Sequence, residues 1–190
     1  IKRETNRGTE DEILLSRLID RAIRPLFPKG FNDEIQIFCY ILSVDPEISP
    51  DIPAFLGVSA ALAISNLPFT DIVSAVKMGY VDNNFVINPS DSTLESSSLN
   101  LFLAGKDSEN QDGILMIEAG AKEVGEEVAF EAIPQGMKAM QNSIEGIKTF
   151  QRAYKNKHPE FIKRSAPEVK ELSAVTQAVK AEVEAYCEKG

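Results

Sequence analysis

The sequence contains very few of the side chains on which nucleophilic triads and zinc sites depend. His158 is the single histidine among 190 residues. Zinc sites and Ser-His-Asp triads commonly use imidazole groups, so this chain offers little from which to assemble either. We therefore expect neither a histidine-based metal cluster nor a catalytic triad within it.

Cysteines and long apolar runs are also scarce. Cys39 and Cys187 lie far apart in unlike surroundings, which favours reduced thiols of an intracellular protein over a disulfide or a metal site. No stretch approaches the roughly 18 consecutive apolar residues of a membrane span. The first residues are charged and no apolar region follows them, so we expect no signal peptide. These absences favour a protein without membrane contact.

Positive charge is in the minority, and it is unevenly placed. The chain has 20 Lys and Arg residues against 29 Asp and Glu residues, a formal net charge of -9. This balance argues against indiscriminate binding to polyanions. The first 30 residues nevertheless carry seven basic and five acidic side chains. Because salt screens charges beyond about 8 to 10 Å, a local cationic patch can exist in an acidic protein.

Local patterns predict an α+β fold. Thr9 and Glu12 form a capping box for a helix with an apolar stripe, which should end near Arg24, before Pro25. The predicted stripe is Ile13, Leu14, Leu18 and Ala22. An apolar run rich in Ile, Phe and Tyr predicts a buried strand over 34–44.

The remaining segments extend this pattern. A helix of small residues should begin with Asp51 as N-cap and pack closely on strands. Turn residues between 72–81 and 85–89 predict a β-hairpin, and 99–105 and 113–121 read as two more strands. A helix is expected over 123–155, kinked or shifted by Pro134, and another after Ser165. We therefore expect one α+β domain over 1–155 and an all-helical extension over 156–190.

Two groups of basic residues are candidates for binding phosphate. Arg17, Arg21 and Arg24 share one helix face, where they can clamp phosphates or form structural salt bridges such as Asp20–Arg24. Lys2 and Arg3 stand in a loop, where they can reach a nucleic-acid backbone or remain solvated. The residue pattern alone leaves both alternatives open in each group.

No motif in the chain predicts a catalytic or metal site. The ten acidic residues between Asp91 and Glu131 lack ligand spacing and suggest a solvated surface. Ser96–Ser98 has no glycine and is followed by a strand rather than a helix N-terminus, so we interpret it as a turn and strand entry. No paired-carboxylate arrangement is visible. We assign no catalytic residue and no metal ligand.

Three motifs give the chain a resemblance to the polynucleotide phosphorylase family. They are "SRLIDRAIRPLFPKGF", "LSVDPEISPDIPAFLGVSAALAIS" and "GYVDNNFVINP". The resemblance implies the RNase PH-like fold of that family's first core domain, lacking its first strands, followed by the start of a helical domain. It also implies a homotrimeric ring that degrades RNA from the 3′ end by phosphorolysis, using phosphate and Mg²⁺. The family's catalytic groups belong to a second core domain.

The same resemblance assigns roles to the basic residues. The family's loop ahead of this helix carries a basic pair that contacts RNA in the central channel, so Lys2 and Arg3 inherit that role. Arg7 lies in a loop one residue longer than usual and is a further RNA-binding candidate. Arg17, Arg21 and Arg24 are expected to be structural or interfacial.

The expected protein is thus an inactive part of a phosphorolytic exoribonuclease, located in the cytoplasm or alternatively in an organelle matrix. A non-catalytic RNA-binding or scaffold module is the main alternative. A free-standing RNase PH-type enzyme is disfavoured by the predicted helical tail.

Overall fold

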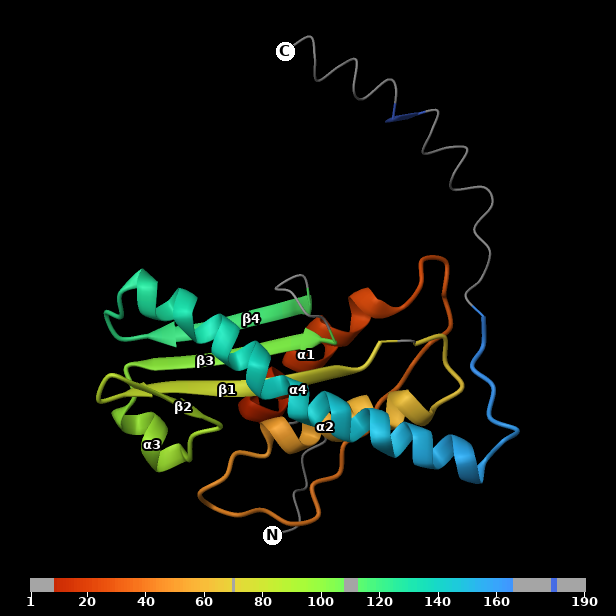
Figure 1. The fold of residues 1–190 in the computed structure, drawn as a ribbon, viewed down its shortest axis with the longest axis horizontal. Coiled ribbons are helices and arrows are strands. Elements are labelled where there is room, and N and C mark those ends of the chain that lie inside the picture. Colours follow the sequence, from red (N-terminus) through yellow and green to blue (C-terminus); the bar gives the residue numbers. More distant parts are fainter. Residues whose placement is uncertain (1–8, 70, 108–112, 166–178, 181–190) are drawn as a thin grey trace.

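The computed structural model describes residues 9–69, 71–107, 113–165 and 179–180 (Figure 1). The labelled helices and strands lie between residues 10 and 157. The elements are α1 (Glu10–Ile23), the 3-10 helix η1 (Arg24–Leu26), α2 (Asp51–Ile64), β1 (Val73–Val81), β2 (Asn84–Ile87), α3 (Asp91–Ser96), β3 (Leu99–Lys106), β4 (Ile114–Ala121) and α4 (Glu126–Lys157).

The four strands form one antiparallel sheet in the order β2-β1-β3-β4. The predicted hairpin is confirmed as β1 and β2, which pair from Met78–Ile87 to Val81–Asn84. Asp82 and Asn83 adopt φ angles of 49° and 61°. Positive φ at both turn residues matches the right-handed twist of the strands, which is why Asp and Asn occur there. The two strands predicted after the hairpin are confirmed as β3 and β4.

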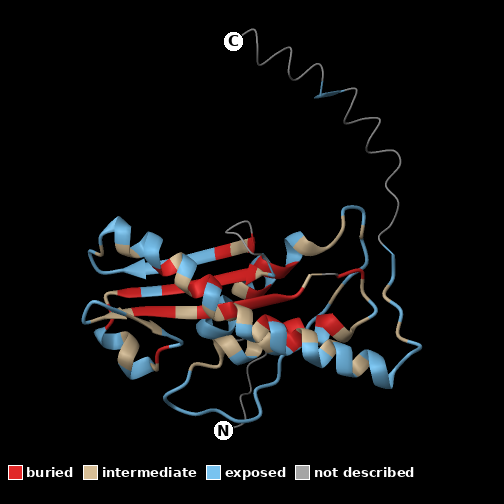
Figure 2. Cartoon of the chain, viewed as in Figure 1, coloured by how far each residue is buried: buried red, intermediate tan, exposed pale blue. Residues whose placement is uncertain are grey.

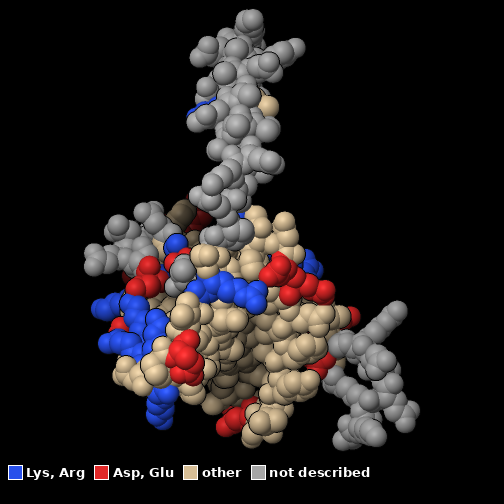
Figure 3. Space-filling model, turned by 90° about the vertical axis from the view of Figure 1, so that its right-hand side faces the viewer, with Lys and Arg blue, Asp and Glu red and all other residues tan. Residues whose placement is uncertain are grey.

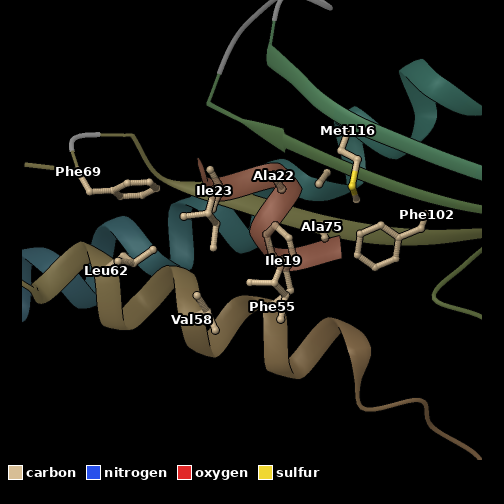
Figure 4. Close-up of a cluster of buried hydrophobic side chains, with 12 residues drawn as sticks. Ile19, Ala22, Ile23, Phe55, Val58, Leu62, Phe69, Ala75, Phe102 and Met116 are labelled. Atoms are coloured by element: carbon tan, nitrogen blue, oxygen red, sulfur yellow. The ribbon is translucent and has the colours of Figure 1, made fainter. Parts of the chain in front are cut away.

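Side chains of successive strand residues point to opposite sides of a sheet. Both faces of this sheet carry apolar side chains, and helices cover both faces (Figure 1). On one face α1 and α2 pack against Val73 and Ala75 of β1 and Phe102 of β3 (Figure 4). On the other face α4 packs against Val76 and Met78 of β1 together with Leu101 and Leu103 of β3. The sheet is therefore the middle of three layers, with an apolar core on each side.

α1 begins and ends where the sequence predicts. The Thr9 backbone N–H donates to Glu12 Oε2 at 2.6 Å, and the Glu12 backbone N–H donates to Thr9 Oγ1 at 3.3 Å. The predicted apolar stripe is only partly correct, because Ile13 and Leu14 are each 50% exposed. The buried residues, Ile19, Ala22 and Ile23, all lie in the second half of the helix, which is the half that meets α2 and the sheet.

The prediction of a strand over 34–44 is wrong: the backbone is extended there but belongs to no sheet of the described residues. Its apolar side chains are exposed, as the pale segment at the bottom of Figure 2 shows. The run of apolar residues over 34–44 indicates a preference for extended backbone and for burial of both faces of the segment. A strand also needs a neighbour, and no described segment lies beside this one as a paired strand.

Helix α2 differs from its prediction by one residue, because Pro50 rather than Asp51 is the N-cap. α3 was not predicted. α4 runs from Glu126 to Lys157 with Pro134 inside it, so the proline does not displace the start of the helix. No helix in the described part of the chain is sufficiently long and apolar to span a bilayer.

The predicted helix after Ser165 falls almost entirely outside the described residues, which continue there only at 179–180. The all-helical extension and the boundary at residues 155/156 therefore stay predictions.

Candidate nucleic-acid interface

Arg17 and Arg21 of α1, and Arg24 at the start of η1, are exposed to solvent, and two of these three arginines are engaged in ion pairs. Arg24 binds Asp20 with two nitrogens, Nε to Oδ2 at 3.1 Å and Nη2 to Oδ1 at 2.7 Å, which confirms the predicted pair. Arg21 Nη1 donates to Glu118 Oε2 of β4 at 3.0 Å. This pair joins α1 to the edge strand of the sheet, so Arg21 has a structural role.

Arg17 differs from its two neighbours on the helix face. It is exposed, and it makes no ion pair or hydrogen bond with another side chain in the described ranges. Its guanidinium therefore keeps its planar set of donors available to a phosphate. Of these three arginines, Arg17 is the one whose guanidinium has no side-chain partner among the described residues.

The residues predicted to contact RNA most directly, Lys2, Arg3 and Arg7, lie outside the described residues. They immediately precede the first turn of α1, which carries Glu10, Asp11 and Glu12. Carboxylates in the first turn stabilise the helix but repel phosphate, so the N-terminus of α1 is not itself an anion site. RNA binding at this end would depend on the basic residues that precede α1 in the sequence.

A largely buried ion pair, which the sequence did not predict, fixes α2 on the sheet. Lys77 Nζ on β1 binds Asp51 at the start of α2 and donates to Ser49 Oγ at 3.1 Å. The side chains are only 14% and 23% exposed. The sequence feature that could have revealed this pair is a lysine within a nearly continuous apolar strand. Since Asp51 belongs to one of the resemblance motifs, this motif has a structural explanation.

Lys163 forms a second unpredicted anchor. Its Nζ donates to the carbonyl oxygens of Phe69 and, at 3.5 Å, of Leu62 near the end of α2. Burial, followed by the charge of Lys155, lowers the pKa of Lys163 below its ordinary value. Lys163 thereby holds the segment after α4 against α2.

The single histidine lies at the surface beside the end of α4. His158 stacks on Tyr154, with ring centroids 4.4 Å apart, and its Nδ1 lies 3.2 Å from Glu160 Oε1. The pKa of Glu160 is lowered, chiefly by its own backbone N–H and then by the hydrogen bond with His158. These contacts cap the helix end and involve no nucleophile.

The end of the molecule where α4 finishes shows Lys and Arg side chains interspersed with Asp and Glu (Figure 3). Several of these cations are already paired: Lys148 with Asp107, Arg152 with Glu145, and Arg164 with Asp33 at 3.3 Å. Paired charges attract a polyanion less than an uninterrupted basic surface does. This face is thus a weaker candidate for RNA than the basic residues before α1.

The serine-rich stretch before β3 has a structural role. Ser97 Oγ accepts a hydrogen bond from the Tyr80 N–H at 2.8 Å and lies in the buried corner between β1 and β3. Within the described ranges, no group of three or more His, Cys, Asp or Glu residues is arranged to hold a metal ion.

Two domain models of one family match the chain in order. The description "3′ exoribonuclease family, domain 1" applies to residues 1–68, and "3′ exoribonuclease family, domain 2" applies to residues 71–139. The chain belongs to the RNase PH family of 3′ exoribonucleases. In this RNase PH-family chain the first model covers α1, α2 and the segment between them. The second covers the whole sheet and the first part of α4.

Solved structures of related fold support this membership. The rice (Oryza sativa) protein Rrp46 is 14% identical with a TM-score of 0.60, and the match covers 78% of this chain and 69% of that one. An archaeal exosome core chain is 16% identical with a TM-score of 0.57, over 75% of this chain and 66% of that one. The chain spans about two thirds of the length of these structures. The likeness establishes the RNase PH-like fold. The predicted α+β, RNase PH-like fold class is therefore confirmed, whereas the missing first strands and the helical extension stay predictions.

Proposed function

We propose that this chain is part of a phosphorolytic 3′-to-5′ exoribonuclease of the polynucleotide phosphorylase type, which releases nucleoside diphosphates from RNA. The observation that supports this proposal best is the ordered match of both family domain models, which coincides with the arginine helix and the motifs that carry the resemblance. In this proposal the chain contributes RNA contact and a surface for ring assembly, and bond cleavage occurs in another part of the protein.

RNA contact is proposed for the loop that carries Lys2, Arg3 and Arg7, with Arg17 as an additional contact. Contacts of lysine and arginine with phosphates provide affinity without sequence preference. This suits an enzyme that moves along an RNA strand of any sequence. Three copies of the loop around a homotrimer axis would concentrate positive charge where the RNA backbone passes.

Phosphate and Mg²⁺ are proposed as the co-substrate and the metal of the complete enzyme. Among the described residues, no group of three or more His, Cys, Asp or Glu is arranged to hold a metal ion, and we assign no step through Mg²⁺ to this part of the protein.

A non-catalytic RNA-binding or scaffold module is the second candidate function. The similarity to a chain of an archaeal exosome core favours it, because an exosome core is a multi-subunit assembly. A phosphate-dependent RNA decay assay on the full-length parent protein separates the two candidates. Release of nucleoside diphosphates that requires added phosphate supports the enzyme. RNA binding without any such decay supports the scaffold.

The RNA-contact assignment is tested with Lys2→Ala/Arg3→Ala in the full-length parent protein. Titration of single-stranded RNA at several salt concentrations should show weaker binding. The slope of log K against log salt, which is negative, should become less steep by about 1.4, since each phosphate contact on a single strand contributes about −0.7. Binding should weaken by a similar factor for RNAs of different sequence.

The matched control is Lys155→Ala/Lys157→Ala, which removes the same charge from exposed positions at the end of α4. Its affinity and salt slope should stay close to those of the unchanged protein. An unchanged slope in Lys2→Ala/Arg3→Ala, or an equal loss in both double variants, would remove the RNA path from the N-terminal loop.

A further inference from the structure

Residues 158–165, which we call the strap, follow α4 and lie against the end of α2 (blue segment at the right of Figure 1). The Arg164 backbone N–H donates to the carbonyl oxygen of Asn66 at 2.9 Å. Lys163 Nζ donates to two further carbonyl oxygens of this region, those of Leu62 and Phe69. Two consecutive residues thus fasten the strap to the end of α2.

Lys163 supplies a positive charge to the carboxyl end of α2. The last carbonyl groups of a helix carry partial negative charge, so an ammonium group beside them is stabilising. The ammonium of Lys163 has three N–H donors, whereas an acylated lysine is neutral and has one. Acylation would therefore remove the charge and at least one of the two hydrogen bonds. The chemical state of this amine decides how firmly the strap is held.

Lys163 differs from the other partly buried lysines in its surroundings. It is half-buried, and it pairs with no carboxylate in the described part of the chain. The other partly buried lysines among the described residues each pair with a carboxylate; they are Lys77, Lys106 and Lys148. Burial, and then the charge of Lys155, lowers the pKa of Lys163. A larger share of this amine is therefore unprotonated, which is the nucleophilic form.

Positive charge is concentrated around the strap. Residues 151–165 carry five Lys and Arg side chains against one acidic side chain, Glu160, an excess of four in a chain with a formal net charge of -9. Two of the five, both arginines, are paired with carboxylates from elsewhere in the chain. The charge of Lys155 acts directly on Lys163. A small anionic reagent is therefore attracted to the neighbourhood of this amine.

We propose that Lys163 is an acylation site, modified by a small acyl phosphate, and that its acylation releases the strap from the end of α2. The unprotonated Nζ attacks the acyl carbonyl carbon and a C–N bond forms. The bond from that carbon to the phosphate oxygen breaks, inorganic phosphate leaves with the electron pair, and the surplus amine proton passes to water. The strap is the connection to residues 166–190, so acylation acts on that connection. RNA takes no part in this step, which makes it independent of the proposed function.

The first test measures the rate of acylation with acetyl phosphate as the probe. The full-length parent protein is treated, and peptide mapping by mass spectrometry follows each lysine with time. Lys163 should be acetylated about threefold faster than Lys155 or Lys157, because more of its amine is unprotonated. Lys155→Ala should slow the acetylation of Lys163 about threefold, because it removes both an attraction for the reagent and one cause of the lowered pKa.

Lys157→Ala is the matched control for Lys155→Ala. Both residues are exposed in the last turn of α4 and carry the same charge, but the pKa of Lys163 responds to Lys155. Lys157→Ala should therefore leave the rate of Lys163 acetylation nearly unchanged. Equal slowing in the two variants would contradict the role of Lys155.

The second test measures release of the strap by amide hydrogen exchange. The Arg164 N–H reports on it, because this group bonds to the body. Lys163→Gln, which is neutral like an acylated lysine, should speed exchange at Arg164 about tenfold, and the acetylated protein should show the same increase. Lys163→Arg keeps the charge and the donors and should stay within about twofold of the unchanged protein. Circular dichroism should show that both variants remain folded.

Three results would each overturn the proposal. The first is acetylation of Lys163 no faster than that of Lys155 and Lys157. The second is unchanged exchange at Arg164 in both the acetylated protein and Lys163→Gln. The third is an equal increase in Lys163→Arg, because the shape of the side chain rather than its charge would then hold the strap.

Discussion

At the scale of single residues, the ion pairs differ widely in how much water surrounds them. Arg24 and Asp20 are 76% and 51% exposed, whereas Lys77 and Asp51 are mostly buried. Exposed pairs contribute little to stability because water and salt screen them. A buried charge that loses its partner is costly because it has been removed from water without compensation. Lys77 and Asp51 should therefore matter far more than the arginine pairs of α1.

We predict that Asp51→Asn lowers the free energy of unfolding by about 2 kcal/mol, because it leaves the Lys77 ammonium with Ser49 as its remaining side-chain partner. Asp20→Asn should cost less than about 0.5 kcal/mol. Urea denaturation measures both values. Lys77→Met combined with Asp51→Asn should recover part of the loss, since the charge is then replaced by an apolar side chain of similar length. Equal losses in Asp51→Asn and Asp20→Asn would contradict this ranking.

The residue scale also shows which site predictions the sequence can support. The Asp20–Arg24 pair follows from helical spacing alone, and the structure confirms it. The contact of Arg21 with Glu118 joins residues 97 positions apart. It depends on how α1 lies against β4, which spacing within one helix does not reveal.

At the scale of elements, local signals predicted those segments whose stabilising contacts are themselves local. The capping box fixed the start of α1, and the Asp82–Asn83 turn fixed the β1–β2 hairpin. The strand prediction over 34–44 was wrong because a strand forms only beside a neighbouring strand, and the pattern within one segment does not show whether such a neighbour is present. α3 was missed because a helix of six residues contains too few positions for an apolar period.

Close contact between α4 and the sheet gives a prediction about glycine. A Cβ at Gly136 would lie 2.8 Å from Leu103 Cδ2 and 3.3 Å from Val76 Cγ1. Gly136→Ala should therefore force the buried Leu103 side chain or the helix to shift, and lower the free energy of unfolding by about 1–3 kcal/mol. Thermal or urea unfolding provides the measurement.

Gly146 in the same helix is the matched control, because a Cβ added there would meet nothing within 4 Å beyond the adjoining helix backbone. Gly146→Ala should raise stability by about 0.5–1 kcal/mol, since alanine favours the helix and the site has room. If both alanine variants were stabilising, the close approach of α4 to the sheet at Gly136 would be incorrect.

At the scale of the whole molecule, the described part divides into a packed body and the exposed segment 35–44. The three layers bury Phe55, Leu62 and Leu103 almost completely, and the strands of the sheet satisfy one another's backbone groups. Residues 35–44 share neither property. Composition predicted a globular core, and the position of the arginines predicted a local basic region. Neither composition nor the position of the arginines could reveal that the apolar segment 35–44 lies outside the core, because its burial depends on which other segments pack against it.

This division predicts two levels of local stability in the isolated 190-residue chain. Amides of β1 and β3 should exchange with deuterium slowly, only through unfolding of the whole body. Amides of 35–44 should exchange quickly, because no hydrogen bond within the described residues protects them. Leu42→Ser should change the free energy of unfolding by less than about 0.5 kcal/mol. Leu62→Ser should cost more than about 3 kcal/mol, because Leu62 is buried in the core that α1 and α2 form with the sheet. Slow exchange at 35–44, or similar costs for the two leucine variants, would mean that residues 35–44 belong to the packed body.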